Sequence, residues 1–230
     1  DVPTRRRRVD LIAIVALVVA SPLVAAPPED DGVRIRYASS LRMERRDDGS
    51  TVVTVTDAWD GAPPLRYAFV GAGEATLGGS EYEEVIEVPV ERVVSLSTTA
   101  IPHLDDLGVL DTLVAIDDPR YVYNAEVHRA ATEGGVEVVG GAAEVDIEGI
   151  LALRPDVVIT SVVGGDDPTT TRLRAAGVPV VVLADWREKS PLGRAEWIKL
   201  FGTLYDRGDD AARLFDQRSD GYREAAARAA

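Results

Sequence analysis

The sequence predicts an α/β fold. In the C-terminal part of the chain, short apolar segments alternate with stretches of helical periodicity. Strands that are apolar along their whole length are typical of a parallel sheet with both faces covered. Hydrophobic residues make up 46% of the 230 residues, which is enough to bury a core. These observations predict a Rossmann-like parallel sheet with helices on both faces, preceded by a β-rich segment and followed by a long helix.

The N-terminal residues follow the sequence pattern of a secretory signal. A basic block at residues 5–8 is followed by an apolar run at 11–20 and by small residues up to Ala26. The apolar run is shorter than the roughly 20 residues of a membrane-spanning helix, and Pro27 disfavours cleavage after Ala26. We therefore expect residues 1–26 to be a signal peptide or an N-terminal anchor, with a disordered tail as the alternative. The expected location is the periplasm or the outer face of the cell membrane.

Residues 27–90 are predicted to be β-rich. Every residue from 51 to 56 is Thr or Val, and β-branched residues favour pleated strands. The tight-turn signal Asp48-Gly49 precedes this run. We expect the segment to pack on the rest of the protein as an added subdomain. Its strand candidates are residues 51–56, 66–70 and 83–88.

Residues 91–207 alternate between strands and helices, with Asp146 as a predicted helix N-cap. Ligands of such parallel sheets bind beyond the carboxyl ends of the strands. Residues 97–99, 117–124 and 161–167 are therefore expected at one rim. Strands are expected at 92–97, 112–117, 136–139, 156–161 and 178–183. Helices are expected before Gly108 and at 124–132, 146–153 and 169–176, and residues 190–205 follow the fifth strand.

Residues 208–230 are predicted to form one long helix. Ala211, Leu214, Phe215 and Tyr222 fall on one stripe at helical spacing. No stop signal precedes the last residue, so we expect the chain to continue beyond it.

From residue 91 onward, the order of motifs resembles the ABC importer substrate-binding proteins of the iron-complex (siderophore or haem) and cobalamin family. No single motif is specific, but the ordered set is, and the last motif resembles the siderophore-type branch. The motifs are ERVVSLS at 91–97, DIEGILALRPDVVI at 146–159, AGVPV at 176–180 and SPLGRAEWI at 190–198.

The resemblance implies two α/β lobes bridged by one long helix, with the ligand in the cleft between them. Residues 91–207 would then be the N-terminal lobe and residues 208–230 the start of the interlobe helix, and the second lobe is missing. The implied function is non-enzymatic: a monomer captures an iron chelate, a ferric siderophore or haem, and delivers it to the permease of an ABC importer. No resident cofactor, catalytic residue or metal site is expected. The alternatives are a cobalamin-binding protein of the same family, a Rossmann-like enzyme and a non-binding scaffold domain.

Ligand-binding candidates follow the first two strands. Ser97, Thr98 and Thr99 offer hydroxyl and N–H groups near a helix N-terminus, which favours anionic ligand groups, and simple helix capping is the alternative. In the next loop, Tyr121 and Tyr123 are expected to pack against a flat chelate or locally under the loop. Its further candidates are Asn124 and Arg120, the latter pairing with chelate carboxylates or remaining an ordinary surface residue.

Further candidates follow later strands. Trp186 and Arg187 come after the fifth strand, where Trp186 lines the cleft or packs beneath residues 190–197. Glu196 and Arg194 are expected to tie that segment to the lobe by hydrogen bonds. The resemblance also implies that an acidic side chain near Asp166 and Asp167 docks against the permease. The alternative for Asp167 is a helix N-cap.

The net charge and a few remaining residue types and motifs exclude several classes of function or site. A net charge of −14 repels phosphate backbones, so we expect no nucleic-acid partner. The chain has no cysteine, which excludes disulfides and thiolate metal sites. His103 and His128 lie on different predicted helices and are expected at solvated positions. Gly71-Ala72-Gly73 is predicted to be a turn, because Thr76 stands where a dinucleotide-binding loop needs glycine.

Overall fold

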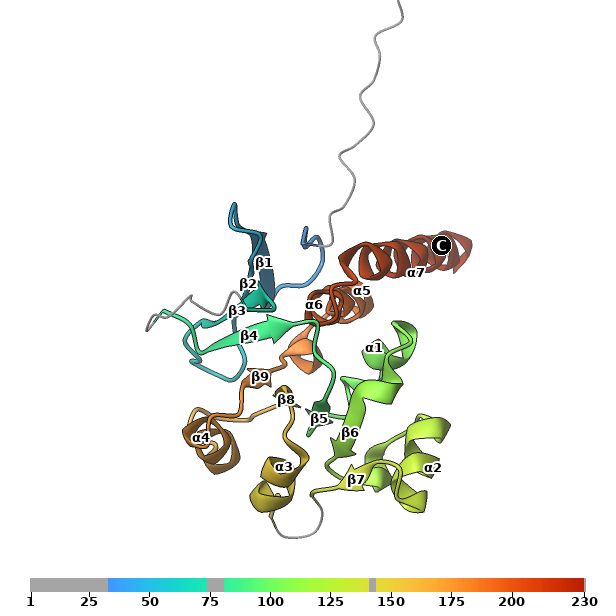
Figure 1. Cartoon of the computed structure of the whole chain (residues 1–230). Helices are drawn as coiled ribbons and strands as arrows, with labels where there is room; N and C mark the ends of the chain where they lie inside the picture. The colour runs from blue at the N-terminus through green and yellow to red at the C-terminus, as the bar shows by residue number, and fades with distance from the viewer. Residues whose placement is uncertain (1–32, 74–80, 141–143, 230) are drawn as a thin grey trace, which may run out of the picture.

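The computed structural model describes residues 33–73, 81–140 and 144–229 of the chain. The described residues form a four-stranded sheet and a five-stranded sheet together with helices (Figure 1). The predicted signal or anchor at residues 1–26 and Thr76 lie outside the described residues.

The N-terminal sheet consists of β1 (Leu41–Arg45), β2 (Thr51–Val55), β3 (Leu65–Gly71) and β4 (Glu84–Val88), in that order. The first three strands are antiparallel, whereas β4 is parallel to β3. The predicted turn before β2 closes at Gly49, whose φ of 85° is a conformation that glycine adopts without steric cost. The prediction of a β-rich segment is therefore confirmed. The sequence does not predict β1, because LRMER contains no β-branched residue and β1 is an edge strand.

All strands of the second sheet are parallel, as predicted. Their order across the sheet is β7-β6-β5-β8-β9. The chain thus starts in the middle, runs to one edge and returns to build the other half. Such a reversal beside the first strand is where parallel α/β sheets place their ligands. The strands are β5 (Val93–Ser95), β6 (Leu113–Ile116), β7 (Glu137–Val138), β8 (Val157–Thr160) and β9 (Val180–Val182).

The helices begin and end close to their predicted positions. Asp146 caps its helix as predicted, because its Oδ1 accepts the N–H of Gly149 at 2.9 Å. The stretch after the fifth strand, residues 190–205, contains two helices that meet at Trp197. The helices are α1 (Ile101–Asp106), α2 (Ala125–Glu133), α3 (Ile147–Leu153), α4 (Pro168–Ala175), α5 (Pro191–Glu196), α6 (Ile198–Leu204) and α7 (Gly208–Ala229). Short 3₁₀ turns are η1 (Leu110–Thr112), η2 (Pro119–Tyr121) and η3 (Asp185–Arg187).

Apolar cores lie on both faces of the parallel sheet, which confirms the predicted layers. On one face, Val94, Val158 and Val180 pack with Ile150 of α3 and Leu173 of α4. The opposite face is covered by α1, α6 and the N-terminal sheet, which share a single larger core. Figure 1 shows the parallel sheet in the middle, the N-terminal sheet above it and α7 reaching out at the upper right.

The two sheets are joined by polar contacts as well as by this core. The hydroxyl of Tyr67 in β3 accepts the N–H of Val182 in β9 at 3.1 Å. A strap formed by residues 34–40 crosses to α5, where Glu196 accepts the N–H groups of Arg36, Tyr37 and Ala38. Glu196 therefore forms hydrogen bonds as predicted, but these bonds tie its segment to the strap and not to the lobe.

No helix within the described ranges is both long and apolar enough to cross a membrane. The last turns of α7, residues 220–229, are exposed.

Candidate functional site

A cleft of ≈ 400 Å³ lies at the carboxyl ends of the parallel strands. Four loops line it, those that follow β5, β6, β8 and β9. The loops are gathered rather than scattered, because neighbouring parallel strands end at the same edge of the sheet. The lining residues are Leu96, Ser97, Thr98, Thr99, Asp117, Tyr121, Ser161, Val162, Val163 and Trp186.

A chain of hydroxyl groups connects the lining of this cleft to a buried carboxylate. Ser161 Oγ lies 2.7 Å from Ser97 Oγ, which lies 3.0 Å from Thr99 Oγ1. Thr99 Oγ1 in turn donates to Asp185 Oδ1 at 3.0 Å. Asp185 is buried, and this burial raises the pKa of its carboxyl, although the hydrogen bond from Thr99 opposes the rise.

Aromatic and apolar side chains also line the cleft. Tyr121 and Trp186 are 61% and 41% exposed, and Val163 is 90% exposed. Exposed apolar side chains are informative where they gather at one place on the surface, and these three line the same cleft. The rings of Tyr121 and Trp186 offer flat surfaces to a bulky ligand.

Asp117 is the one charged residue among the described residues that line the cleft. It follows β6, and its carboxylate rests against Gly140, where a Cβ would lie only 1.5 Å from Asp117 Oδ1. Burial raises the pKa of Asp117, and the neighbouring charge of Asp118 raises it further.

Five of the predicted ligand-binding residues line the cleft: Ser97, Thr98, Thr99, Tyr121 and Trp186. None of the first three caps α1, because its N-cap position is Ala100, which makes no side-chain cap. Trp186 faces the cleft rather than lying beneath residues 190–197.

The other predicted residues of the second loop do not line the cleft. Arg120 turns back onto Asp118, with Nε and Nη2 donating to Asp118 Oδ2 at 2.9 and 2.5 Å. Asn124 is the N-cap of α2 and accepts the N–H groups of Glu126 and Val127. Tyr123 is fully exposed and packs neither in the cleft nor under the loop.

Arg187 also turns away from the cleft. Its Nη2 donates to Asp57 and Asp60 at 3.1 and 2.7 Å, so it ties η3 to the loop after β2. Asp167 is the N-cap of α4, because its Oδ2 accepts the N–H of Thr170 at 2.7 Å. Asp166 beside it is exposed.

Sequence reasoning misses Asp117, Ser161 and Asp185 as individual site residues. The first two lie within the stretches expected at the rim, so their position directly after a strand is the signal that would have found them. Asp185 also follows a strand, directly before Trp186, but only the fold brings it within hydrogen-bonding distance of Thr99.

The prediction that His103 is a solvated helix position is wrong. His103 is 7% exposed, and its ring stacks on Phe201 of α6 with 4.8 Å between the centroids. Helical spacing alone does not reveal that α6 covers this side of α1. His128 on α2 is exposed, as predicted. Across the ranges that the structure describes, no three His, Asp or Glu side chains gather as a metal site would require.

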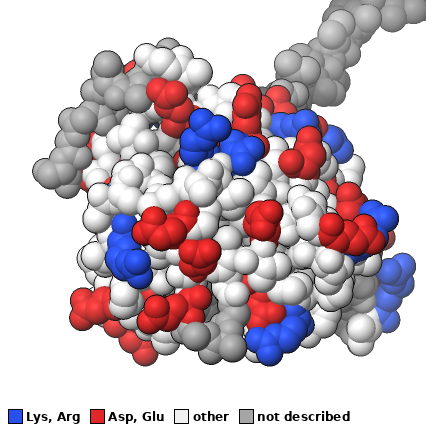
Figure 2. Space-filling view, turned by 60° about the horizontal axis from the view of Figure 1, so that its bottom comes forward, with Lys and Arg blue, Asp and Glu red and all other residues white. Residues whose placement is uncertain are grey.

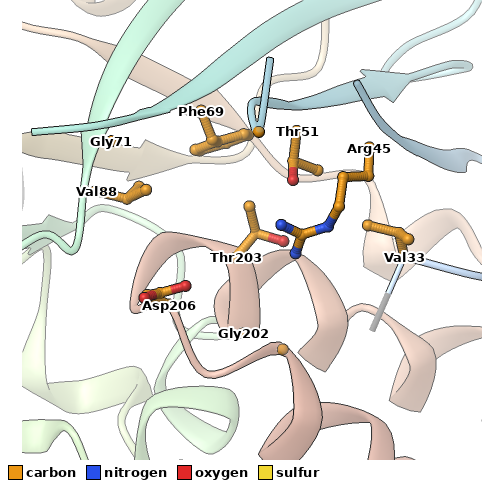
Figure 3. A pocket seen from close by; sticks show the side chains of 11 residues that line it. Val33, Arg45, Thr51, Phe69, Gly71, Val88, Gly202, Thr203 and Asp206 are labelled. Carbon is orange, nitrogen blue, oxygen red and sulfur yellow. The ribbon is translucent and has the colours of Figure 1, made fainter. Parts of the chain in front are cut away.

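A smaller hollow of ≈ 130 Å³ lies between the N-terminal sheet and the loop from α6 to α7 (Figure 3). The side chain of Arg45 extends into it toward Thr203, and Asp206 lies across the hollow. This hollow has less than half the volume of the cleft. The cleft at the strand ends is therefore the better candidate for a bulky ligand.

The surface charge is mixed on the face shown in Figure 2. Acidic and basic side chains lie among uncharged ones, and this face carries no continuous basic patch. The net charge of the protein is −14. This face therefore offers no positively charged surface that would suit a phosphate backbone.

Comparison with known proteins adds to this geometry. The chain is 27% identical over 143 residues to an uncharacterized lipoprotein of Methanocaldococcus jannaschii, covering 60% of this chain and 34% of that protein. It is 28% identical over 127 residues to a vitamin B12-binding protein of Vibrio parahaemolyticus, covering 55% and 44%. A solved structure from an ABC-type Fe³⁺-hydroxamate transport system of Saccharomonospora viridis aligns with a TM-score of 0.43 and 28% identity, covering 56% and 47%. The chain thus spans between a third and a half of the length of these relatives.

The family model described as "Periplasmic binding protein" matches residues 93–230. This stretch begins at β5 and includes every strand of the parallel sheet, the cleft loops and α7. Since the match covers more than half of the chain, the protein belongs to the periplasmic binding protein family.

Proposed function

We propose that this chain is part of the solute-binding component of an ABC importer and captures a metal chelate at the cleft. The observation that carries the proposal is the ≈ 400 Å³ cleft at the strand ends, whose lining combines aromatic side chains with hydroxyl groups. Concave, mostly apolar sites with a few placed polar groups suit small-molecule ligands. The proposed ligand is an iron chelate, a ferric siderophore or haem, and a corrinoid is the alternative. The relative named as a vitamin B12-binding protein supports this choice of bulky chelates.

The ligand would bring its own metal, so the proposed role of the protein is to hold a chelate rather than to catalyse a reaction. Flat or rounded chelates present large apolar surfaces, and the rings of Tyr121 and Trp186 would cover them. Delivery would follow on the outer face of the membrane. There the exposed Asp166, at the loop before α4, is the proposed contact with the permease.

Ligand titration followed by tryptophan fluorescence tests the proposal. Trp186 lines the cleft, whereas Trp197 is buried and Trp59 lines a separate hollow. We expect one or more of ferrichrome, ferrioxamine B, haemin and cyanocobalamin to quench the emission saturably. Trp186→Phe should remove most of the quenching and weaken binding measured by calorimetry. The matched control Trp59→Phe should retain both.

The absence of saturable binding for every chelate in this panel would contradict the proposal. The permease contact is tested separately with Asp166→Lys in the intact transport system. We expect uptake to fall while the chelate affinity of the purified protein stays unchanged. Equal uptake by the variant and the wild type would rule Asp166 out as a contact.

A further inference from the structure

The charge of the cleft wall is set by a single side chain. Asp117 is the charged residue of the lining, and no side chain or backbone group of the described residues donates a hydrogen bond to its carboxylate. Lysine and arginine are absent from the described lining. Among the described residues of this wall, a ligand in the cleft therefore meets one carboxylate without a hydrogen-bond donor and no Lys or Arg side chain.

The nearby arginines do not alter this charge. Arg120 is bound to Asp118 through its Nε and Nη2 atoms. Arg187 is bound to Asp57 and Asp60. Each guanidinium is thus paired with carboxylates of the protein itself, which reduces its attraction for an anionic ligand. The sequence-based expectation of an arginine that recognises chelate carboxylates finds no support in these contacts.

The hydrogen bonds among the hydroxyl groups also run in one direction, from Ser161 through Ser97 and Thr99 to Asp185. An ionised Asp185 only accepts hydrogen bonds, so the single hydroxyl proton of Thr99 goes to Asp185. The Ser97 hydroxyl must then donate to Thr99, and the Ser161 hydroxyl must donate to Ser97. None of these three hydroxyl protons remains for the ligand. Ser161 Oγ can therefore only accept a hydrogen bond from a ligand in the cleft.

A helix N-terminus does not offset this. The helix after Ser97, Thr98 and Thr99 is α1, which has only 6 residues and no side-chain cap. A helix this short has a weak dipole, because few peptide units are aligned.

We infer that this wall of the cleft selects neutral or positively charged chelates that present N–H or O–H donors, and that it discriminates against anionic chelates. The inference rests on the proposed function and specifies its ligand class. Asp117 supplies the charge preference, and the hydroxyl series from Asp185 to Ser161 adds an acceptor at Ser161, whereas Thr98, Tyr121 and Trp186 of the same lining carry their own O–H and N–H donors. Gly140 leaves room for the Asp117 carboxylate, since a Cβ at this position would lie only 1.5 Å from Asp117 Oδ1.

A matched series of ferric hydroxamates separates charge from shape. Ferrioxamine B carries a free ammonium group, its N-acetyl derivative is neutral and its N-succinyl derivative carries a carboxylate, while all three share one iron-binding core. We expect the affinity to fall in that order, with steps on the order of tenfold for a partly exposed charge. Added sodium chloride should reduce the steps by screening.

Two variants assign the preference to the named groups. Asp117→Asn should bring the three affinities within about threefold of one another, because the charge is gone while the shape is kept. Thr99→Val disconnects Asp185, which frees Ser97 and Ser161 to donate, and should improve binding of the succinyl derivative. Glu87→Gln, an exposed change on β4 away from the cleft, is the matched control and should leave the series as in the wild type.

The possible outcomes separate this inference from the proposed function. If the succinyl derivative binds as tightly as ferrioxamine B, or if Asp117→Asn leaves the series unchanged, the inference is wrong and the proposed function stands. If none of the three binds, cyanocobalamin, which is neutral and carries amide N–H groups, is compared with haemin, which carries propionates. Tighter binding of haemin overturns the inference, and tighter binding of cyanocobalamin supports it. If no chelate binds at all, the proposed function fails and the inference with it.

Discussion

Two buried glutamates hold the strap of residues 34–40 against the α/β lobe. Glu196 is fully buried and accepts the N–H groups of Arg36, Tyr37 and Ala38. Glu188 accepts the N–H groups of Ser39 and Ser40 and the indole N–H of Trp197. Hydrogen bonds to an ionised carboxylate are about twice as strong as neutral ones. The carboxylates therefore satisfy strap N–H groups that no strand pairing satisfies.

Glu196→Gln should destabilise the protein strongly while leaving the shape of the side chain unchanged. The amide presents one acceptor oxygen instead of two and brings a donor toward N–H groups, and it removes a counter-charge 3.6 Å from the buried Lys199. We expect the free energy of unfolding to fall by about 3 kcal/mol, as measured by urea denaturation. The exposed Glu224→Gln on α7 is the control. A loss no larger than that of the control would show that the carboxylate does not hold the strap.

His103 links stability to pH. Burial lowers its pKa from 6.5 to about 4, and Arg218 lowers it slightly, while Asp106 opposes the shift. The neutral ring is therefore favoured in the folded state. This contribution is fully present above the unfolded-state pKa and is lost as the pH falls from about 6.5 toward 4.

His103→Leu should make the stability less sensitive to acid. A lowering from 6.5 to about 4 corresponds to on the order of 3 kcal/mol. We expect the wild type to lose that much more stability than the variant between pH 7 and pH 4, with urea denaturation at each pH as the measurement. His128→Gln, at an exposed position on α2, is the matched control. Parallel pH curves for the wild type and His103→Leu would contradict the assignment.

At the scale of elements, the strap is also a brace for α7. The ring of Tyr37 packs on Phe215 of α7 with 5.8 Å between centroids. Arg36 pairs with Asp216, and Arg223 donates to the Tyr37 hydroxyl. The strap thus contacts α7 over two turns, and α6 packs along the first part of the same helix. The direction in which α7 leaves the lobe depends on these contacts.

Tyr37→Ala should loosen α7 beyond Phe215 without unfolding the lobe. The substitution removes the ring that lies between Phe215 and Arg223. We expect amide hydrogen exchange to become at least tenfold faster in residues 216–223, while exchange in β5 and β8 stays slow. Tyr222→Ala, an exposed aromatic change on the same helix, is the control. Unchanged exchange in α7 would mean that α6 alone fixes this helix.

For the whole molecule, the shared core predicts that both sheets unfold together. Residues of β2, β3 and β4 belong to the same buried cluster as residues of β5, β8 and α6. A cluster that spans both sheets leaves neither with an apolar face of its own to bury after separation. Two-state behaviour is usual for units that share one core.

Tyr67→Phe tests this coupling with the loss of one oxygen. Its hydroxyl accepts the N–H of Val182 across the two sheets, so the variant leaves a buried donor unpaired and should lose about 1–3 kcal/mol. Circular dichroism and tryptophan fluorescence should report one coincident transition at a lower urea concentration. Thr203→Val, a matched removal of a partly exposed hydroxyl, should change the midpoint much less. Two separate transitions would show that the sheets are independent.

The sequence by itself determines the order of strands and helices and the rim of the sheet. Alternating apolar runs identify all five parallel strands, and short-range signals such as Asp146 and Gly49 mark a cap and a turn. These features depend on residues close together in the chain. The strand-end rule then predicts which loops meet, because it follows from parallel pairing alone.

The tertiary structure alone decides where the long polar side chains go. Arg187 reaches Asp57 and Asp60, Asp185 meets Thr99, and Glu196 holds the strap, over separations in the sequence of 130, 127, 86 and up to 160 residues. His103 is buried because α6 packs on it. A long or ionisable side chain has several partners within reach, and the backbone positions that choose between them are set only when distant elements pack. The cleft's position is therefore foreseeable from the sequence, whereas the fold decides which charged side chains face it.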